Sequence, residues 1–223
     1  NKLFDIIYLG DYMKKTYIII IIITTFLAIL LGYKLSCLTK YTIKENYNYK
    51  ITDTLEIKQT TSKNKFEFKN ITFKNIIKDY EIEEEKDNSI LLTNNKNSIK
   101  ISINNSNTNE LITNNKNIKE YFKENKINND LDLIKYTIKN KNKKYNLFTS
   151  KNKLKNNYDI IDTIVNNIPS NHEIIEIKGS NIGYILKSDK YRSINILKND
   201  KVYNITMIIQ DKESTIDNLV NDI

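Results

Sequence analysis

The feature that most constrains this chain is a run of 18 residues without a formal charge, from Thr16 to Tyr33. At its centre lie six consecutive isoleucines, Ile18 to Ile23. An α-helix rises about 1.5 Å per residue, so the run covers roughly 27 Å, close to the thickness of a bilayer's hydrocarbon core. A core helix of a soluble protein needs a polar face, and this run has none. The pattern predicts a membrane span that includes Thr16, Ile20, Phe26 and Tyr33.

The flanks of the run leave three fates open. Met13, Lys14 and Lys15 precede it, as positive residues precede the apolar core of a secretory signal peptide. A retained signal anchor is favoured, because the run exceeds the usual signal core of about 7–15 residues and has no small-residue pair at the cleavage spacing. Cleavage and release is the second fate.

The third fate is lipidation. The sequence from Leu35 to Cys37 resembles the end of a lipoprotein signal, which implies that Cys37 would carry a diacylglyceryl group and become the new N-terminus. Lys34 departs from that pattern, since the family has an aliphatic residue three positions before the cysteine.

Positive charge sets the expected orientation. Lys14 and Lys15 favour a cytoplasmic tail over residues 1–15, although Lys34, Lys40 and Lys44 nearly balance them on the other flank. A long domain translocates largely regardless of its own charge. We therefore expect a single-pass cell-membrane protein whose C-terminal domain is extracytoplasmic.

Composition limits what charge can mean. Ile, Asn and Lys make up 110 of the 223 residues, and all three have A/T-rich codons. An A/T-rich bacterial genome explains this abundance. Residues 40–223 contain 31 basic and 25 acidic residues, and codon bias explains this excess of positive charge as well as attraction to an anionic partner does. The single cysteine excludes an internal disulfide and a cysteine-based metal cluster, and no cofactor is expected.

Periodicity predicts an α+β domain over residues 65–223, after a stalk or early strands over residues 34–64. Alternating apolar residues predict strands at 66–73 and a hairpin from 89–93 to 99–103. Helical spacing links Leu111 to Ile118, Tyr121 and Phe122, and a second set from Leu131 to Ile138. A short strand is predicted from Tyr145 to Thr149.

The strongest predicted helix runs from Leu154 to Ile168 and stops at Pro169, the only proline. An antiparallel meander is then predicted over 173–178, 182–187, 191–197 and 202–209. Asp211 is expected to cap a last helix, with an apolar face from Ile216 to Ile223.

This order of elements, together with the hairpin from Lys198 to Ile205, resembles PsbP/Mog1-like domains. The resemblance would cover residues 65–223 and implies an antiparallel sheet packed with helices in a small sandwich. Members of that family are recurrently membrane-anchored or lipid-anchored and mostly bind partners. No functional residue is carried over, because no catalytic motif carries the likeness.

The reactive residue types in this chain form no complete catalytic motif. His172, the only histidine, has no nucleophile motif near it and is expected to be a loop residue. Arg192, the only arginine, could make a bidentate contact with a carboxylate or phosphate. The glycines at 179 and 183 are expected to flank a hairpin turn, and the acidic run from Glu81 to Asp87 to form a charged strand edge.

The sequence therefore predicts a non-catalytic binding module for an envelope protein or an anionic cell-wall polymer, attached to the membrane and without a nucleic-acid partner. A membrane-tethered hydrolase that uses Asp159 or Asp162 with Glu173 is the alternative from another class. A ligand-sensing ectodomain is the third hypothesis.

Overall fold

The computed structural model describes residues 2–42, 47–57, 66–69, 71–73, 80–94, 98–141, 143–179, 181–188 and 191–208. The chain forms two compact units. Unit 1 comprises residues 1–44 and 143–158, and unit 2 comprises residues 45–142 and 159–223. The predicted helix that begins at Asp211 and the residues 58–64 of the predicted stalk lie outside the described residues.

Unit 1 is built on α1 (Lys2–Lys40), which contains the whole apolar run and continues beyond it. The first turns of α5 (Lys151–Asn167) lie beside the end of this helix. Tyr41, just after α1, packs edge-on against Tyr158 with ring centroids 6.0 Å apart. The ammonium of Lys151 lies 5.8 Å from the ring centroid of Tyr33. These two contacts fix the segment after the apolar run against α5.

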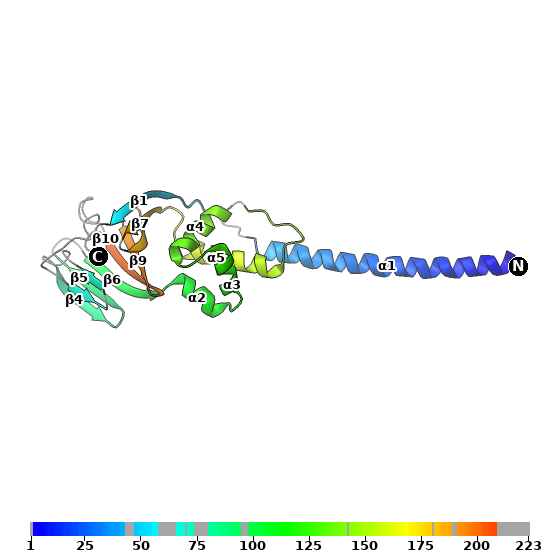
Figure 1. Cartoon of the computed structure of the whole chain (residues 1–223), viewed down its shortest axis with the longest axis horizontal. Coiled ribbons are helices and arrows are strands. Elements are labelled where there is room, and N and C mark those ends of the chain that lie inside the picture. The colour runs from blue at the N-terminus through cyan, green and yellow to red at the C-terminus, as the bar shows by residue number, and fades with distance from the viewer. Residues whose placement is uncertain are drawn as a thin grey trace. The chain divides into compact units, whose positions relative to one another are not determined.

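Unit 2 contains an eight-stranded sheet in the order β1-β7-β8-β9-β10-β6-β5-β4 (Figure 1). Its strands, in chain order, are β1 (Ile51–Ile57), β4 (Glu81–Lys86), β5 (Ser89–Thr93), β6 (Ser98–Asn105), β7 (Glu173–Gly179), β8 (Ile182–Lys187), β9 (Tyr191–Lys198) and β10 (Lys201–Ile208). β2 (Phe66–Phe68) and β3 (Ile71–Phe73) form a separate antiparallel pair.

The expected α+β class and the C-terminal meander are confirmed, but the prediction of a purely antiparallel sheet is wrong. β1 pairs with β7 in parallel, so the sheet is mixed. β10 also pairs with β6, which joins the meander to the earlier hairpin in one sheet. A strand's polarity depends on which distant strand it meets, and the alternation of its side chains does not encode that.

The hairpin between β9 and β10 shows how local sequence fixes register. Asn199 and Asp200 have φ angles of 49° and 59°, so both central residues of the two-residue turn adopt left-handed conformations. Asn and Asp tolerate this region, and such turns match the twist of the strands that they join. The register that follows pairs Lys198 with Lys201 and Ile194 with Ile205.

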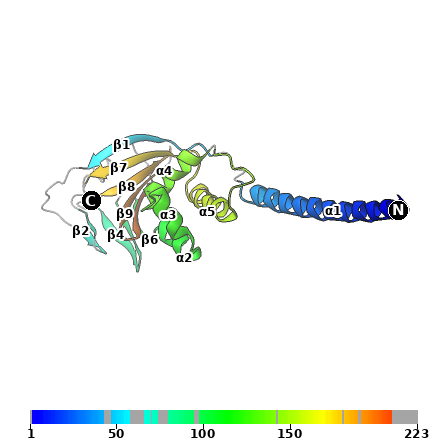
Figure 2. The ribbon, with the colours of Figure 1, turned by 45° about the vertical axis from the view of Figure 1, so that its right-hand side comes forward.

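The two faces of the sheet differ. One face carries a cluster of buried aliphatic residues, among them Ile99, Ile177, Ile194 and Ile205. The other face is turned toward α2 (Asn107–Asn114), α3 (Ile118–Asn125) and α4 (Asp130–Asn140), as Figure 2 shows. Lys135 of α4 bonds to Glu176 of β7, which ties this helix to that face.

Two local predictions are corrected. The residues from Tyr145 to Thr149 form a turn instead of a strand, because the side-chain oxygen of Asn146 accepts hydrogen bonds from Phe148 N (3.1 Å) and Thr149 Oγ1 (3.2 Å). Leu111 and Ile118 belong to separate helices, because the chain becomes extended at Asn115. α4, and α5 up to Asn167, agree with the predicted helices.

Candidate functional site

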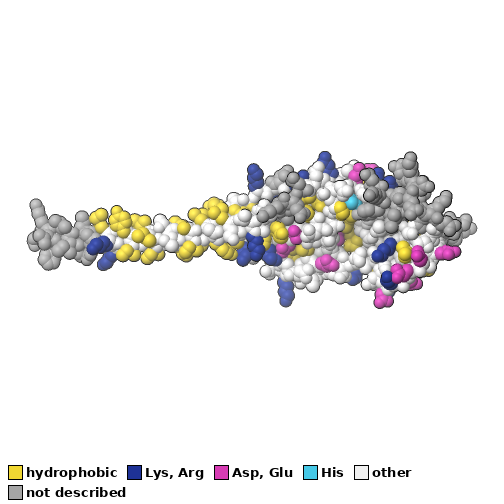
Figure 3. Space-filling model, turned by 180° about the vertical axis from the view of Figure 1, so that it is seen from behind, with side chains coloured by type: hydrophobic (Ala, Val, Ile, Leu, Met, Phe, Trp, Pro, Cys, Tyr) yellow, Lys and Arg dark blue, Asp and Glu magenta, His cyan; other side chains and the backbone are white. Residues whose placement is uncertain are grey.

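α1 is long and apolar enough to cross a membrane. The large apolar side chains from Tyr17 to Tyr33 are between 43% and 64% exposed, so the protein itself does not cover them. Figure 3 shows these apolar side chains along α1, with Lys side chains near both ends of the stretch. Exposed apolar surface on this scale is stable in lipid and unfavourable in water.

Cys37 lies in the last turns of α1, four residues before Tyr41, whose backbone N–H donates to the Cys37 carbonyl (3.1 Å). The side chain is buried and reduced. Signal-peptide processing at Cys37 would require this helical turn to open so that the backbone before the cysteine could reach a peptidase.

Asp130, the first residue of α4, is the most deeply buried carboxylate among the described residues, with 0% exposure. Its two oxygens accept four hydrogen bonds from the start of α2: from the backbone and side-chain nitrogens of Asn107 (both 2.9 Å) and from Thr108 N (2.9 Å) and Oγ1 (2.8 Å). A negative charge at a helix N-terminus also interacts favourably with the helix dipole. Asp130 therefore joins α2 to α4 by capping α2.

The negative charge of Asp130 also affects the pKa of Tyr184 on β8. Burial of its ring, followed by the negative potential of Asp130, raises the pKa of the Tyr184 hydroxyl well above its usual value of 10.0. Both causes act in the same direction, because each opposes formation of a phenolate. The hydroxyl is therefore a neutral group and unsuited to act as a general base.

A row of polar side chains crosses the helix-facing side of the sheet from strand to strand. Cross-strand pairing aligns Glu176 with Tyr184, Tyr184 with Asn195, Asn195 with Asn204, and Asn204 with Ser102. We call these five residues the polar row. Its first three members are buried and its last two are half-buried, so the row runs from the helix layer toward solvent.

Short hydrogen bonds hold the row together. Asn204 Nδ2 donates to Asn195 Oδ1 (2.8 Å) and to Ser193 Oγ (2.7 Å), and Thr206 Oγ1 donates to Asn204 Oδ1 (2.6 Å). Glu176 forms an ion pair with Lys135, with 2.7 Å between Oε1 and Nζ. Buried polar groups that satisfy each other in this way fix a single arrangement of the strands.

Part of the same side of the sheet is accessible, where the row reaches β10 and β6. Lys100 and Asn104 of β6 are exposed, and Ser102, Asn204 and Thr206 beside them are half-buried. We call these five residues the open polar face. They present amide, hydroxyl and ammonium groups on a regular strand surface, which can form hydrogen bonds to a partner.

The carboxylates predicted for a hydrolase have separate contacts. Asp159 accepts a hydrogen bond from Asn115 (3.2 Å), and Asp162 accepts one from Asn166, one turn farther along α5 (3.2 Å). Glu173, at the start of β7, lies 3.9 Å from Lys187 in an exposed ion pair. Each carboxylate is thus engaged with a different neighbour.

His172 and Arg192 occupy different parts of unit 2. His172 is buried just before β7, where its Nδ1 lies 2.9 Å from Asn171 Oδ1. Arg192 lies on β9, paired with Lys187 of β8, and its Nε is buried without a hydrogen-bond partner among the described residues. Within the described part of the chain no carboxylate forms an ion pair with Arg192, and a contact with a phosphate stays a prediction.

The acidic run and the two glycines lie in strands of the sheet. Glu81, Glu83, Glu84 and Glu85 lie on β4, the outer strand of the sheet, where every residue is exposed. Gly179 and Gly183 lie at the β7–β8 hairpin, as predicted. Within the described ranges, no group of three or more His, Cys, Asp or Glu residues could hold a metal ion.

Sequence reasoning missed Asp130 and the polar row. Their signal was present in part, because Ser193 and Asn195 alternate with Ile194 and Ile196, and Asn204 and Thr206 alternate with Tyr203 and Ile205. Such alternation is typical of a strand whose polar face meets water. Only the sheet order shows that these residues lie side by side and under helices at one end.

Comparisons with protein-family models, with curated proteins and with solved structures gave no match.

Proposed function

We propose that this protein is a single-pass, membrane-anchored and non-catalytic binding module, which uses the open polar face of unit 2 to bind an envelope protein outside the cell. The observation that carries the proposal is the change in burial along the polar row. Its first three members are buried in the fold, whereas Ser102 and Asn204 at the other end are half-buried and Lys100 beside them is exposed.

Charge supports a protein partner over an anionic wall polymer. Unit 2 has 24 basic and 25 acidic residues, so it has no excess of positive charge to attract a polyanion. A patch of amides, hydroxyls and one ammonium suits the polar rim of a transient protein interface. The order of elements in unit 2 also suits the PsbP/Mog1-like sandwich that the sequence suggests.

Site-specific photo-crosslinking in intact cells tests this proposal. A photoreactive residue at Lys100 or Ser102 should give a protein adduct of defined mass, whereas the same residue at Thr54, exposed on β1 at the opposite edge, should not. A polymer adduct at Lys100 would change the partner class. No adduct at the open polar face, or equal adducts at Thr54, would contradict the proposal.

Retention of α1 and the side on which unit 2 lies are tested separately. The intact mass of membrane-extracted protein should include residues 1–36, whereas a lipidated Cys37 at the N-terminus would give a smaller protein with a diacylglyceryl addition. Protease added to whole cells from which the wall has been removed should cleave unit 2. Protection of unit 2 would place it in the cytoplasm and contradict the expected orientation.

A further inference from the structure

We propose that unit 1 carries a second membrane contact: the turn around Phe148 and the lysines around it bind the interface of the anionic bilayer that α1 spans. We call Lys143, Lys144, Phe148, Lys151 and Lys153 the juxtamembrane patch. The inference rests on the membrane anchoring in the proposed function, but it does not depend on any partner of unit 2.

Phe148 is 92% exposed, the highest value among the large apolar side chains that the structure describes. It does not lie in a loose loop. Asn146 accepts hydrogen bonds from Phe148 N (3.1 Å) and Thr149 Oγ1 (3.2 Å), and Thr149 N donates to Asn146 O (3.0 Å). Ser150 Oγ then accepts from Lys153 N (3.3 Å) and caps α5. The turn therefore holds an aromatic ring in an outward position, which is unfavourable unless an apolar medium receives it.

Two contacts place this turn at the level of the bilayer surface. Tyr33, the last residue of the apolar run, lies beside Lys151, and Tyr41 lies beside Tyr158. Residue numbers rise together in the two pairs, so α1 and the first half of α5 run in the same direction. The chain that precedes Lys151 therefore lies toward the apolar run, and Figure 1 shows the segment before α5 beside α1. Phe148 is three residues before Lys151, close to the height at which the span ends.

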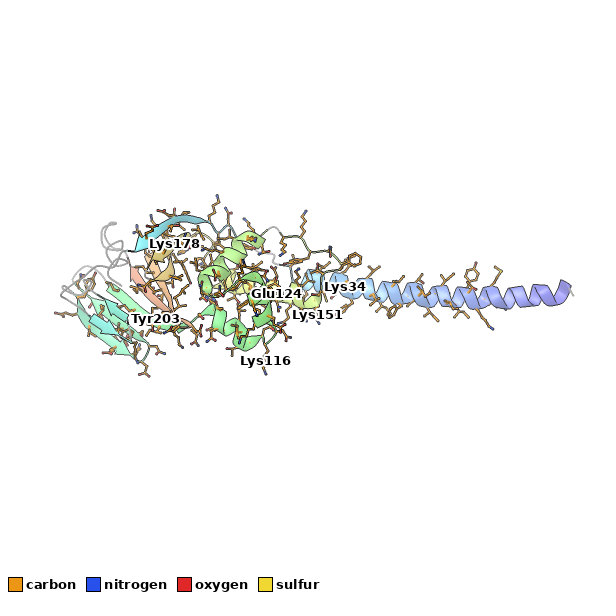
Figure 4. The ribbon with its side chains drawn as sticks, viewed as in Figure 1. Lys34, Lys116, Glu124, Lys151, Lys178 and Tyr203 are labelled. Carbon is orange, nitrogen blue, oxygen red and sulfur yellow. The ribbon has the colours of Figure 1, made fainter. Side chains whose placement is uncertain are left out.

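Charge at this level is of one sign. Residues 143–158 contain five lysines and no acidic residue, and Lys34 and Lys40 of α1 add to them. Figure 4 shows that Lys34 and Lys151 lie near each other at the end of α1. Unit 1 as a whole has 11 lysines and two aspartates, in contrast to the balanced unit 2. A codon bias that supplies lysine everywhere does not explain why the acidic residues are missing from residues 143–158.

The combination of groups identifies the ligand. Clustered lysines beside a span attract anionic lipid head groups, and an aromatic ring is stable at the depth of the head groups. An anionic polymer in water would interact with the lysines but would offer no apolar phase for Phe148. The patch therefore fits a bilayer surface that contains acidic phospholipid.

Tryptophan fluorescence of the full chain in proteoliposomes tests the inference, because the chain has no tryptophan of its own. In vesicles with phosphatidylglycerol, Phe148→Trp should emit at shorter wavelength than in detergent at high salt, and lipids brominated near the head group should quench it. In vesicles of phosphatidylcholine alone, or in 1 M salt, most of the quenching should be lost, because salt at this concentration screens charges beyond about 3 Å.

Four further variants make the result decisive. Phe26→Trp, within the apolar run, reports the span and should be quenched by bromines deep in the acyl chains. Ile82→Trp, exposed on β4 of unit 2, is the control for quenching without a lipid contact. In the Phe148→Trp background, replacement of Lys143, Lys144, Lys151 and Lys153 by Gln should reduce the quenching, whereas the same change of charge at Lys116, Lys119, Lys123 and Lys126 should not.

The outcomes separate the two proposals. Quenching at position 26 without quenching at position 148 would leave the anchor in place and overturn the juxtamembrane contact. No quenching at either position would overturn both. Equal quenching at positions 148 and 82, or equal effects of the two sets of lysine variants, would also overturn the inference, because the contact would then be nonspecific.

Discussion

Unit 1 and unit 2 are both rich in Ile and Lys, yet they differ in the burial of their isoleucines and in the balance of basic and acidic residues. Unit 1 leaves its isoleucines exposed along α1 and has 11 lysines to two aspartates. Unit 2 buries many of its isoleucines against each other and has nearly equal numbers of basic and acidic residues. Codon bias can set how many Ile and Lys residues a chain contains, but it does not set this division.

This difference is the one expected if α1 of unit 1 is surrounded by lipid and unit 2 by water. Apolar side chains that are exposed on every side of a helix are stable in lipid, and lysines without acidic neighbours are stable near anionic head groups. A domain in water instead requires buried apolar groups and satisfied buried polar groups. The comparison supports the proposal that unit 1 attaches the protein to a membrane, and matched changes in the two units test how far they differ.

The largest expected effect comes from two glycines. A Cβ at Gly183 would lie 2.1 Å from the backbone oxygen of Asn195, whereas a Cβ at Gly32 would meet no atom within 4 Å. Gly183→Ala must separate β8 from β9 and should destabilise unit 2 by about 4 kcal/mol or more. Gly32→Ala should leave unit 2 unchanged.

Thermal unfolding of the full chain in detergent micelles, followed by near-ultraviolet circular dichroism of tyrosine, measures both variants. Each variant should still be recovered in the membrane fraction, because α1 does not depend on the sheet for insertion. Loss of Gly183→Ala from the membrane fraction would show that the two units depend on each other and would break the comparison.

Asp130 gives the next largest effect. Asp130→Asn keeps the shape of the side chain but removes its charge and places an amide donor against the donors of Asn107 and Thr108. We expect a loss of about 3 kcal/mol in the free energy of unfolding, since a buried carboxylate contributes strongly through charge-assisted hydrogen bonds.

Asp132→Asn is the matched control in the same helix. Asp132 accepts a hydrogen bond from Asn128 N (2.9 Å) in an exposed position, so its loss should reduce stability by less than about 1 kcal/mol. Urea denaturation compares the two variants. Equal midpoints would mean that the cap on α2 does not hold the helix layer together.

Alkaline pH should destabilise unit 2 through Tyr184. Its folded-state pKa is raised above the ordinary value of 10.0, first by burial and then by Asp130, so ionisation favours the unfolded chain. The contribution is fully present below pH 10 and is lost as pH rises, by about 1.4 kcal/mol per pH unit. Tyr184→Phe should show a shallower fall in the free energy of unfolding between pH 10 and 11.

Burial also raises the pKa of Tyr47, so some loss of stability at alkaline pH should remain in the Tyr184→Phe variant. An unchanged slope would contradict the assignment to Tyr184.

Local patterns in the sequence were sufficient for the elements that local physics determines. The six isoleucines from Ile18 predicted α1, the spacing from Leu154 to Pro169 predicted α5, and alternation predicted the strands of the meander. Each of these depends on periodicity within a few turns or residues. The segment from Tyr145 to Thr149 was mistaken for a strand because the Asn146 side chain competes for the backbone, which alternation does not reveal.

The open polar face could not be predicted, because it depends on contacts between distant residues. Asn204 and Ser102 are neighbours only because β10 pairs with β6, and residues 106–200 separate these two strands along the chain. In the sequence, Asp130 is an ordinary carboxylate in the first turn of a helix. Its role as a cap depends on contacts with α2, which the sequence does not show. Phe148 likewise has no periodic partner, and its exposure is a property of the folded turn.

Two serine caps give the smallest expected effects and the closest comparison of the units. Ser106 in unit 2 and Ser150 in unit 1 each accept a hydrogen bond from the backbone N–H three residues later, at 3.1 Å and 3.3 Å. Ser106 is buried and Ser150 is exposed. Substitution of a capping serine by alanine costs about 0.5–2 kcal/mol. Ser106→Ala should fall at the upper end of that range, because no water can replace the lost acceptor, and Ser150→Ala at the lower end.

Hydrogen exchange of the first turns of α2 and α5 measures each cap directly. If Ser150→Ala caused the larger loss of stability in micelles, the start of α5 would be needed for the stability of the fold. The juxtamembrane patch could then not be treated as a separate lipid contact.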